Sequence, residues 1–396
     1  MGKITQYLYT MWQLAMPIMK NTVVFRSFFG QYNDNPKYIS EALHEQHPNI
    51  KIVWIVRDGS IDSFPPYAKL VNLDSKEYSK MIARAQVVVD NYFGTRSTLL
   101  NGDNKIKGFL FKALARNRKK QLNISTWHGT PLKHIALDEP SYKAKGIKKA
   151  YTNSDILLAG CDYTANIFPS AFQWNKNILM CGTPRNDLLF NITKAQSIKE
   201  KLGLPLDKKV VLFAPTFRNS PDMSGINQLK EMDLNKLLLA LNKKFDEDWC
   251  FVFRSHNLVF KKIQEQGVKI DERIIDGNKH EDMAEYLLCS DCLITDYSAS
   301  MFDYLLTGKP CFLYMPDLLE YRNGERGFYM DISELPFSKS QSFEELIQAI
   351  KQYNASQYQA QSADFLIKIG NKENGHANQT VVDLIQNFIE TGEKKC

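Results

Sequence analysis

The chain has 396 residues, of which 44% are hydrophobic and 24% charged, and its formal net charge is +6. This length and apolar content suffice for two globular domains, and an aromatic content of 12% excludes an intrinsically disordered protein. No uninterrupted apolar run reaches about 18 residues, so no transmembrane helix is expected. The N-terminus also lacks the small-residue cleavage site of a secretory signal.

The seven cysteines are an odd number scattered through apolar runs, which indicates reduced, buried thiols rather than a disulfide framework. Cys289 and Cys292 form a CxxC pair at the junction of a predicted helix and a predicted strand. No second cysteine pair lies nearby to complete a zinc site, so we expect both thiols to be buried.

The first 30 residues form a segment of their own. Aromatic and apolar residues recur there at helical spacing, with basic residues around them. This pattern is typical of an interfacial helix on a membrane surface, and equally of a helix packed on its own domain.

From residue 22 onward, short β-branched or aromatic runs alternate with helical patterns, which predicts an α/β protein built on parallel sheets. The predicted strands of the first half are 22–28, 51–56, 86–91, 123–128, 155–160 and 177–182, and those of the second are 209–216, 249–256, 273–277, 291–296 and 310–315. The predicted helices are 36–46, 76–84, 194–202, 229–245, 280–289 and 299–307.

Two successive doubly wound halves imply two Rossmann-type domains facing a central cleft. A polar stretch with Gly203 and Pro205 predicts the boundary between residues 190 and 206, which gives domains over 31–195 and 206–375. The last helix, within 376–396, carries Val381, Leu384, Ile385, Phe388 and Ile389 at helical spacing, so it should pack on a core. In two-domain folds of this kind, such a helix often crosses back to the first domain.

Charge is concentrated between residues 101 and 150, where twelve Lys or Arg stand against three Asp or Glu. Such a segment attracts polyanions, and nucleic acid, anionic lipid and a phosphorylated polymer all fit it. A solvated basic face is the plainer alternative.

Several predicted strands end in polar side chains, at the sheet edge where ligands bind in open α/β folds. His128 follows the strand that ends near Trp127, just before the turn at Gly129. A histidine there can take a proton from a substrate hydroxyl at neutral pH, or it can simply brace the loop.

Other strand ends supply cations and hydroxyls. Arg254 and His256 point to one side of their strand and suit a phosphate clamp. Thr216 and Arg218 end another strand, and Arg185 follows the strand near the end of the first half. One cation at a strand end would be weak evidence for a binding site. Several strand ends that all carry cations or hydroxyls together indicate a site for phosphate.

The segment 293–310 contains a strand that stops at Thr295 and a helix that opens at Asp296–Ser300 and carries Asp303. Free backbone N–H groups and hydroxyls at such a helix start favour phosphate oxygens, although Ser298 or Ser300 could act only as a helix cap.

No GxGxxG, P-loop, HExxH or GxSxG motif occurs, which disfavours dinucleotide enzymes, P-loop NTPases, zinc proteases and nucleophile-elbow hydrolases. No acidic pair reads as a metal site, so a nucleotide diphosphate would be neutralised by Arg, Lys, His and helix dipoles. We expect no cofactor and no metal.

Several segments together resemble the CDP-glycerol glycerophosphotransferase family of teichoic acid and capsule synthesis. The matching stretches are WHGTPLK (127–133), GTPRND (182–187), APTFR (214–218), RSH (254–256), LITDYSASMFDY (293–304) and PDLLEYRNGERGFYMDI (316–332). The resemblance implies a GT-B-like fold with the CDP donor chiefly in the C-terminal domain and the acceptor toward the N-terminal one.

Site roles follow from the resemblance position by position. His128 and His256 become the catalytic pair, and Gly129, Thr130, Lys133 and Arg185 line the acceptor side or the cleft. The donor-binding residues would be Thr216, Arg218, Arg254, Asp296, Ser298, Ser300, Asp303, Arg326 and Gly327.

The implied reaction moves glycerol phosphate, or ribitol phosphate, from a CDP-linked donor to a lipid-linked saccharide or polyol-phosphate acceptor and releases CMP. The implied place is the cytoplasmic face of the membrane, bound peripherally to anionic lipid, with no nucleic-acid partner. Two alternatives remain: a glycosyltransferase of the same fold that uses a nucleotide sugar, and a non-catalytic membrane-associated binding protein.

Overall fold

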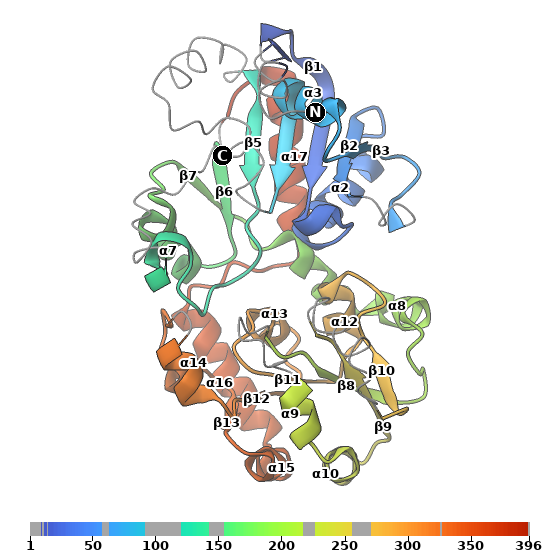
Figure 1. Ribbon diagram of the computed structural model, residues 1–396, viewed down its shortest axis with the longest axis vertical. Helices are drawn as coiled ribbons and strands as arrows, with labels where there is room; N and C mark the ends of the chain where they lie inside the picture. The colour runs from blue at the N-terminus through green and yellow to red at the C-terminus, as the bar shows by residue number, and fades with distance from the viewer. Residues whose placement is uncertain are drawn as a thin grey trace. The chain divides into compact units, whose positions relative to one another are not determined.

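The computed structural model describes residues 15–57, 63–91, 120–141, 154–216, 226–255, 271–324 and 327–394, together with Tyr9, Trp12 and Gln13. The chain forms two compact units, each with its own sheet (Figure 1). Unit 1 comprises residues 1–128, 149–187 and 372–396, and unit 2 comprises 129–148 and 188–371. Each unit therefore consists of separate stretches of chain, whereas the sequence analysis predicted two continuous domains with one boundary between residues 190 and 206.

Unit 1 contains a parallel seven-stranded sheet in the order β3-β2-β1-β4-β5-β6-β7. The strands are β1 (Met19–Arg26), β2 (Lys51–Val56), β3 (Lys69–Asn72), β4 (Ala85–Asp90), β5 (Leu122–Ser125), β6 (Ile156–Ala159) and β7 (Asn177–Met180). The order reverses between β1 and β4, so the loops after these strands diverge and leave a ligand position at the sheet edge.

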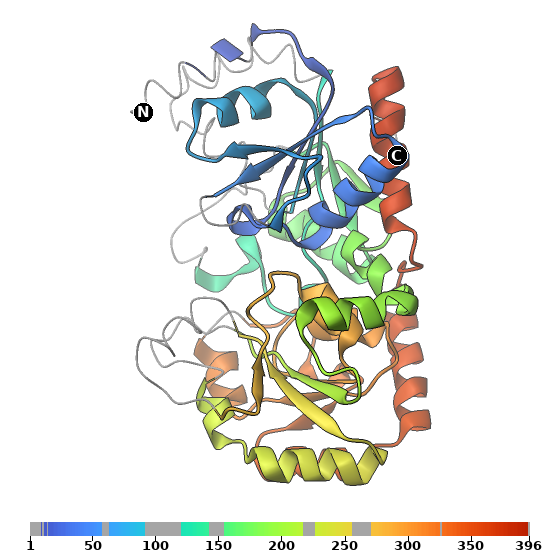
Figure 2. The same ribbon diagram turned by 90° about the vertical axis from the view of Figure 1, so that its right-hand side faces the viewer.

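Helices cover both faces of this sheet. One face packs on α2 (Asp34–Gln46) and α17 (Ala377–Thr391), which run along the sheet in Figure 2. The opposite face packs on α3 (Lys76–Arg84), while α7 (Asp162–Phe172) contacts β6 and β7. All five apolar positions predicted for the last helix pack on the core that α17 shares with α2, and Phe388 is 1% exposed. The prediction that this helix packs on a core is confirmed.

Unit 2 contains a parallel six-stranded sheet in the order β10-β9-β8-β11-β12-β13. The strands are β8 (Lys209–Phe213), β9 (Trp249–Phe253), β10 (Ile274–Asp276), β11 (Cys292–Thr295), β12 (Cys311–Tyr314) and β13 (Ser338–Ser340). Here the order reverses between β8 and β11, which makes the loops after these two strands the corresponding ligand position.

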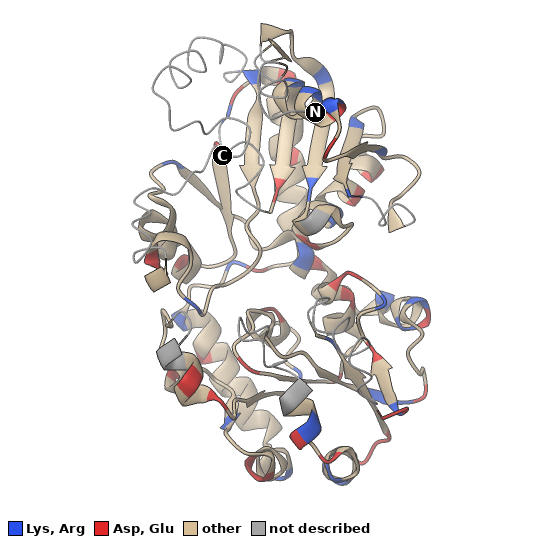
Figure 3. Ribbon diagram, in the orientation of Figure 1, with Lys and Arg blue, Asp and Glu red and all other residues tan. Residues whose placement is uncertain are grey.

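The helices of unit 2 are α8 (Ala195–Leu202), α9 (Ile226–Glu231), α10 (Leu234–Phe245), α12 (Met283–Cys289), α13 (Ser300–Leu305), α14 (Leu318–Gly324), α15 (Phe343–Gln352) and α16 (Ala355–Lys368). α10 and α15 share one hydrophobic core with the sheet, and α12 and α13 contact its strands as well. Most of the strand length in both sheets is uncharged, and charged side chains lie chiefly at strand ends, helices and loops (Figure 3).

Every strand predicted from the sequence is present, and the α/β prediction with two parallel sheets is confirmed. The predicted helix 229–245 is wrong as one element, because the chain breaks between α9 and α10, where the Asp233 carboxylate accepts from Lys236 N and caps α10. Cys289 and Cys292 are buried as predicted, and burial raises the pKa of the Cys289 thiol to about 12.

The N-terminal segment is only partly described. Helical residues occur at Tyr9, Trp12, Gln13 and Ala15, whereas Met19–Arg26 form β1, so the predicted N-terminal helix does not extend through residue 30. Trp12 is 54% exposed. Within the described residues, no helix is long and apolar enough to span a bilayer.

Candidate active site

His128 follows β5 at the carboxyl edge of the unit 1 sheet. Its Nδ1 lies 3.1 Å from the backbone oxygen of Asn91, which follows the neighbouring strand β4. A carbonyl can only accept, so Nδ1 carries the proton and donates it. The ring therefore presents Nε2 as its basic atom.

The half-buried imidazole of His128 is neutral. Desolvation lowers the pKa of His128 to about 4, although the nearby Asp34 carboxylate and the Asn91 carbonyl favour the charged form and Arg185 opposes it. The ring also meets Phe28 edge-on, with centroids 4.8 Å apart. An unprotonated imidazole with a fixed tautomer is what a general base requires at neutral pH.

The backbone before His128 is strained. Trp127 has φ +53°, a left-handed conformation that a bulky residue rarely adopts, and Gly129 follows at φ +117°. The Trp127 ring is buried against Phe168 and Phe172, which holds this conformation. Such outliers persist where surrounding structure enforces them, and they cluster at functional sites.

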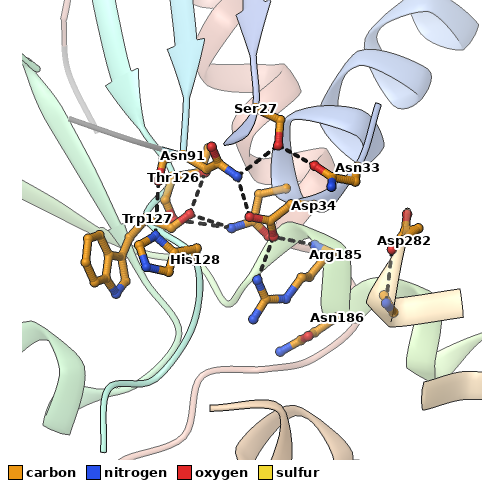
Figure 4. Close-up of polar contacts among 12 residues, drawn as sticks. Ser27, Asn33, Asp34, Asn91, Thr126, Trp127, His128, Arg185, Asn186 and Asp282 are labelled. Carbon is orange, nitrogen blue, oxygen red and sulfur yellow. Dashed lines mark hydrogen bonds and ion pairs between the residues drawn. The ribbon is translucent and has the colours of Figure 1, made fainter. Parts of the chain in front are cut away.

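A polar network links the loops around His128 (Figure 4). The Arg185 Nη1 lies 2.6 Å from Asp34 Oδ1, and Asn91 Nδ2 donates to Asp34 Oδ2 at 2.5 Å and to Ser27 Oγ at 3.1 Å. Asp34 itself has φ +59° at the start of α2. The ends of β1, β4, β5 and β7 are thus tied together by side chains that all follow strands or begin a helix.

The loop that carries Arg185 is hydrogen-bonded to residues 373–378, which lie in and just before the start of α17. Glu373 accepts from Thr183 N at 2.9 Å and from Asn186 Nδ2 at 3.2 Å. Asp187 accepts the N–H groups of Ala377 and Asn378 at the start of α17. The strand-end position of Arg185 therefore depends on contacts with residues 372–378.

In unit 2, Thr216 and Asp296 follow the strands β8 and β11 where the strand order reverses. Asp296 is fully buried, and its Oδ1 accepts from Thr216 N at 2.8 Å and from Tyr297 N at 2.5 Å. The carboxylate thus fixes both loops at the edge where a ligand of this unit is expected.

The predicted phosphate-binding turn follows directly. The Oγ atoms of Ser298 and Ser300 lie 2.8 Å apart, and Ser300 N donates to Ser298 Oγ at 3.3 Å. Asp303 is 4% exposed within α13. The two hydroxyls form a local turn whose binding role stays a prediction.

Arg254 lies at the end of β9 with its guanidinium turned onto backbone. Nη1 donates to the oxygens of Gly277 and His280, and Nη2 donates to Glu281 O at 2.8 Å. The guanidinium also covers the Tyr286 ring at 4.8 Å. In this structure Arg254 braces the loop before α12, and its predicted contact with a phosphate stays a prediction.

The segment after His128 belongs to unit 2 and packs on residues 327–329. Lys133 pairs with Phe328 in an antiparallel bridge, His134 N donates to Gly327 O at 3.1 Å, and Tyr329 N donates to Leu132 O at 2.9 Å. Gly129, Thr130 and Lys133, predicted for the acceptor side, therefore belong to the same unit as Gly327, predicted for the donor pocket.

His256, Arg218 and Arg326, together with most of the basic segment 101–150, lie outside the described residues. Sequence reasoning missed Ser27, Asp34, Asn35 and Asn91. The signal that would have found them is the one used for His128, since Ser27 and Asn91 directly follow strands and NDNP opens α2. Within the described part, no group of three or more His, Cys, Asp or Glu is placed to hold a metal.

A comparison with protein families finds a match over nearly the whole chain. Residues 8–387 match the model of the CDP-Glycerol:Poly(glycerophosphate) glycerophosphotransferase family. The chain belongs to this family. The resemblance inferred from the sequence motifs is thereby confirmed.

Two curated relatives illustrate the match. The teichoic acid poly(glycerol phosphate) polymerase of Staphylococcus epidermidis is 33% identical over 392 residues, which cover 94% of this chain and 51% of that protein. The teichoic acid glycerol-phosphate transferase of Staphylococcus aureus is 33% identical over 402 residues, 96% of this chain and 97% of that protein. The chain spans about half the length of the polymerase.

Among solved structures, a histidine-to-alanine variant of the wall teichoic acid polymerase TagF is similar at a TM-score of 0.79 and 31% identity, covering 98% of this chain and 94% of that one. A histidine-to-asparagine variant of TagF soaked with CDPG is similar at a TM-score of 0.78. The UDP-GlcNAc 2-epimerase of Methanocaldococcus jannaschii, at 13% identity and a TM-score of 0.51, shares the fold. The GT-B-like fold expected from the resemblance is confirmed.

Proposed function

We propose that this chain transfers glycerol phosphate, or a related polyol phosphate, from a CDP-linked donor to a teichoic acid acceptor. The acceptor hydroxyl attacks the β-phosphorus that bears the polyol. The bond from this phosphorus to the oxygen bridging the two phosphates breaks, and CMP leaves. The proton of the hydroxyl passes to His128 Nε2.

The observation that carries this proposal is the state of His128. A neutral imidazole whose Nδ1–H is held by the Asn91 carbonyl has one basic atom available, and the chain belongs to a family of glycerophosphotransferases. Phosphoryl transfer depends mainly on positioning and charge neutralisation, and a positioned base typically adds about 10²–10⁴-fold.

The predicted donor site lies in unit 2. Thr216, Ser298 and Ser300 offer hydroxyls beside the buried Asp296 at the edge where β8 and β11 diverge. Arg218, His256 and Arg326 complete the proposed set. The CDPG soak of a TagF variant is consistent with a cytidine diphosphate donor for a chain of this fold.

The proposed acceptor rests on the family resemblance, and the proposed membrane contact rests on charge. We infer from the family resemblance that the acceptor is a lipid-linked saccharide or a polyol-phosphate chain. The segment 101–150, with twelve basic residues against three acidic ones, would hold the enzyme at an anionic membrane surface. Exposed Trp12 would lie at the lipid boundary, at the cytoplasmic face.

The test is CMP release from CDP-glycerol and from CDP-ribitol, each with and without a lipid-linked saccharide acceptor. Acceptor-dependent CMP release that falls by about 10²-fold or more in His128→Gln would support the proposal. UDP-sugar turnover with no CMP from either CDP donor would replace it with a nucleotide-sugar glycosyltransferase. Unchanged CMP release in His128→Gln would remove His128 from the mechanism.

A further inference from the structure

Asn35 is the point at which the loops after β5 and β7 meet. Its side chain is fully buried, one residue after the ion-paired Asp34. Nδ2 donates to the oxygens of Trp127 at 3.0 Å and Thr126 at 3.4 Å, and Oδ1 accepts from Arg185 N at 3.0 Å. One carboxamide thus contacts the backbone of both loops that carry predicted site residues.

The contacts of Asn35 allow only one orientation of its amide. Exchanging the oxygen and nitrogen would place the NH₂ group against the Arg185 N–H and the oxygen against two carbonyls, and both arrangements are repulsive. A buried amide with both ends engaged is rigid, since losing either partner leaves a polar group unsatisfied.

The bond to Trp127 O acts where the backbone is strained. Asn35 Nδ2 and Thr126 Oγ1 both donate to this oxygen, the latter at 2.9 Å, and Trp127 has φ +53°. The peptide that contains this oxygen leads directly into His128. Its orientation therefore decides whether the His128 ring can reach the Asn91 carbonyl.

We propose that Asn35 is a positioning residue whose carboxamide fixes the Trp127–His128 peptide and thereby aims His128 Nε2 at the acceptor hydroxyl. This inference rests on the proposed role of His128 as the base. Asn35 touches no substrate and acts through the two loops. The charged groups that face His128 in the same network are Asp34 and Arg185.

The experiment compares Asn35→Leu, which keeps the approximate shape and removes all three hydrogen bonds, with Asn35→Asp, which keeps the acceptor for Arg185 N. Asn123→Leu is the matched control, because Asn123 is a buried asparagine of the same unit that contacts Asp155 and lies at the start of β5. Each protein is assayed for kcat and donor KM and for thermal stability.

A second readout needs no turnover. Long-range ¹⁵N–¹H spectra of the histidine rings report the tautomer, with the His128 signals identified by their absence in His128→Gln. In the wild-type protein we expect the Nδ1–H tautomer and slowly exchanging Asn35 carboxamide protons. Absence of CMP release by the wild-type protein would overturn the proposed function while leaving this spectroscopic test of Asn35 intact.

In both Asn35 variants we expect kcat to fall about 10–100-fold with donor KM within about threefold, and the single His128 tautomer to be lost. Asn123→Leu should lose stability while keeping kcat and the tautomer. Wild-type kcat and tautomer in Asn35→Leu, a fall in kcat no larger than that of Asn123→Leu, or rapidly exchanging Asn35 amide protons in the wild type would each overturn the proposal.

Discussion

Asp34 and Arg185 form an ion pair across 151 residues of sequence, with Nη1 and Oδ1 2.6 Å apart and the two side chains only 12% and 13% exposed. The pair joins the start of α2 to the loop after β7. Since solvent reaches it poorly, added salt should screen it less than a surface pair.

A double-mutant cycle on this pair measures its coupling. We expect Asp34→Asn and Arg185→Gln each to reduce the free energy of unfolding, because each leaves a mostly buried charge without its partner. The double variant should lose less than the sum by about 1–3 kcal/mol, measured by urea unfolding. Additivity to within about 0.3 kcal/mol would show that the pair contributes no coupling.

The low pKa of His128 predicts the direction in which folding stability changes with pH. The folded-state pKa of about 4 lies below the ordinary histidine pKa of 6.5, so between these two pH values the unfolded chain binds the proton more readily. The stability linked to His128 is therefore fully present above about pH 6.5 and is lost as pH falls toward 4, by at most about 3 kcal/mol.

Urea unfolding of wild type and His128→Gln between pH 4 and 7 checks this sign, and the variant should lack this part of the slope. If His128 is the base, the acidic limb of kcat/KM should also fall nearer pH 4 than 6.5. An acidic limb at 6.5 together with identical slopes would contradict the desolvated state.

Arg254 should prove essential to the loop before α12. Burial lowers the pKa of its guanidinium, while Tyr286 and the carboxylates of Asp282, Asp276 and Glu281 favour the charged form. The guanidinium donates to three backbone oxygens and covers the Tyr286 ring. We expect Arg254→Lys to cost about 2–4 kcal/mol, because an ammonium cannot reproduce the planar fork. Hydrogen exchange should rise at residues 277–282. The exposed Arg273, 51% accessible, gives the control: Arg273→Lys should change stability by less than about 0.5 kcal/mol.

Replacing Gly327 by alanine should reduce stability more than replacing Gly203, a glycine with a similar backbone conformation. Gly327 has φ +73°, and a Cβ there would lie 3.1 Å from His134 Nδ1, whereas Gly203 has φ +67° and open space around it. Gly203→Ala should cost about 1 kcal/mol from backbone strain alone. Gly327→Ala should cost more in thermal unfolding, and adding His134→Ala should recover the difference. Equal costs for the two glycine variants would mean that the His134 ring moves freely.

Local sequence determined the elements whose apolar runs are long enough to be buried. The eleven predicted strands are present because β-branched and aromatic runs such as 51–56 are buried on both faces, and the helix 76–84 was predicted to the residue. The placement of His128 at a strand end followed from the same pattern.

The sequence did not predict the short elements at the sheet edges or the break between α9 and α10. β3 and β13, with the sequences KLVN and SKS, are strands only because a neighbouring strand pairs with them at the sheet edge. The break that separates α9 from α10 likewise depends on a single cap at Asp233. Apolar periodicity carries no signal for either feature.

Only the tertiary structure decided the surroundings of His128. Asn35 meets Trp127 across 92 residues and Arg185 across 150, and nothing local in NDNP indicates either partner. The physical reason is that apolar burial is set by patterns within each segment, whereas a buried polar group is satisfied by whichever partners the strand order brings to the same edge of the sheet.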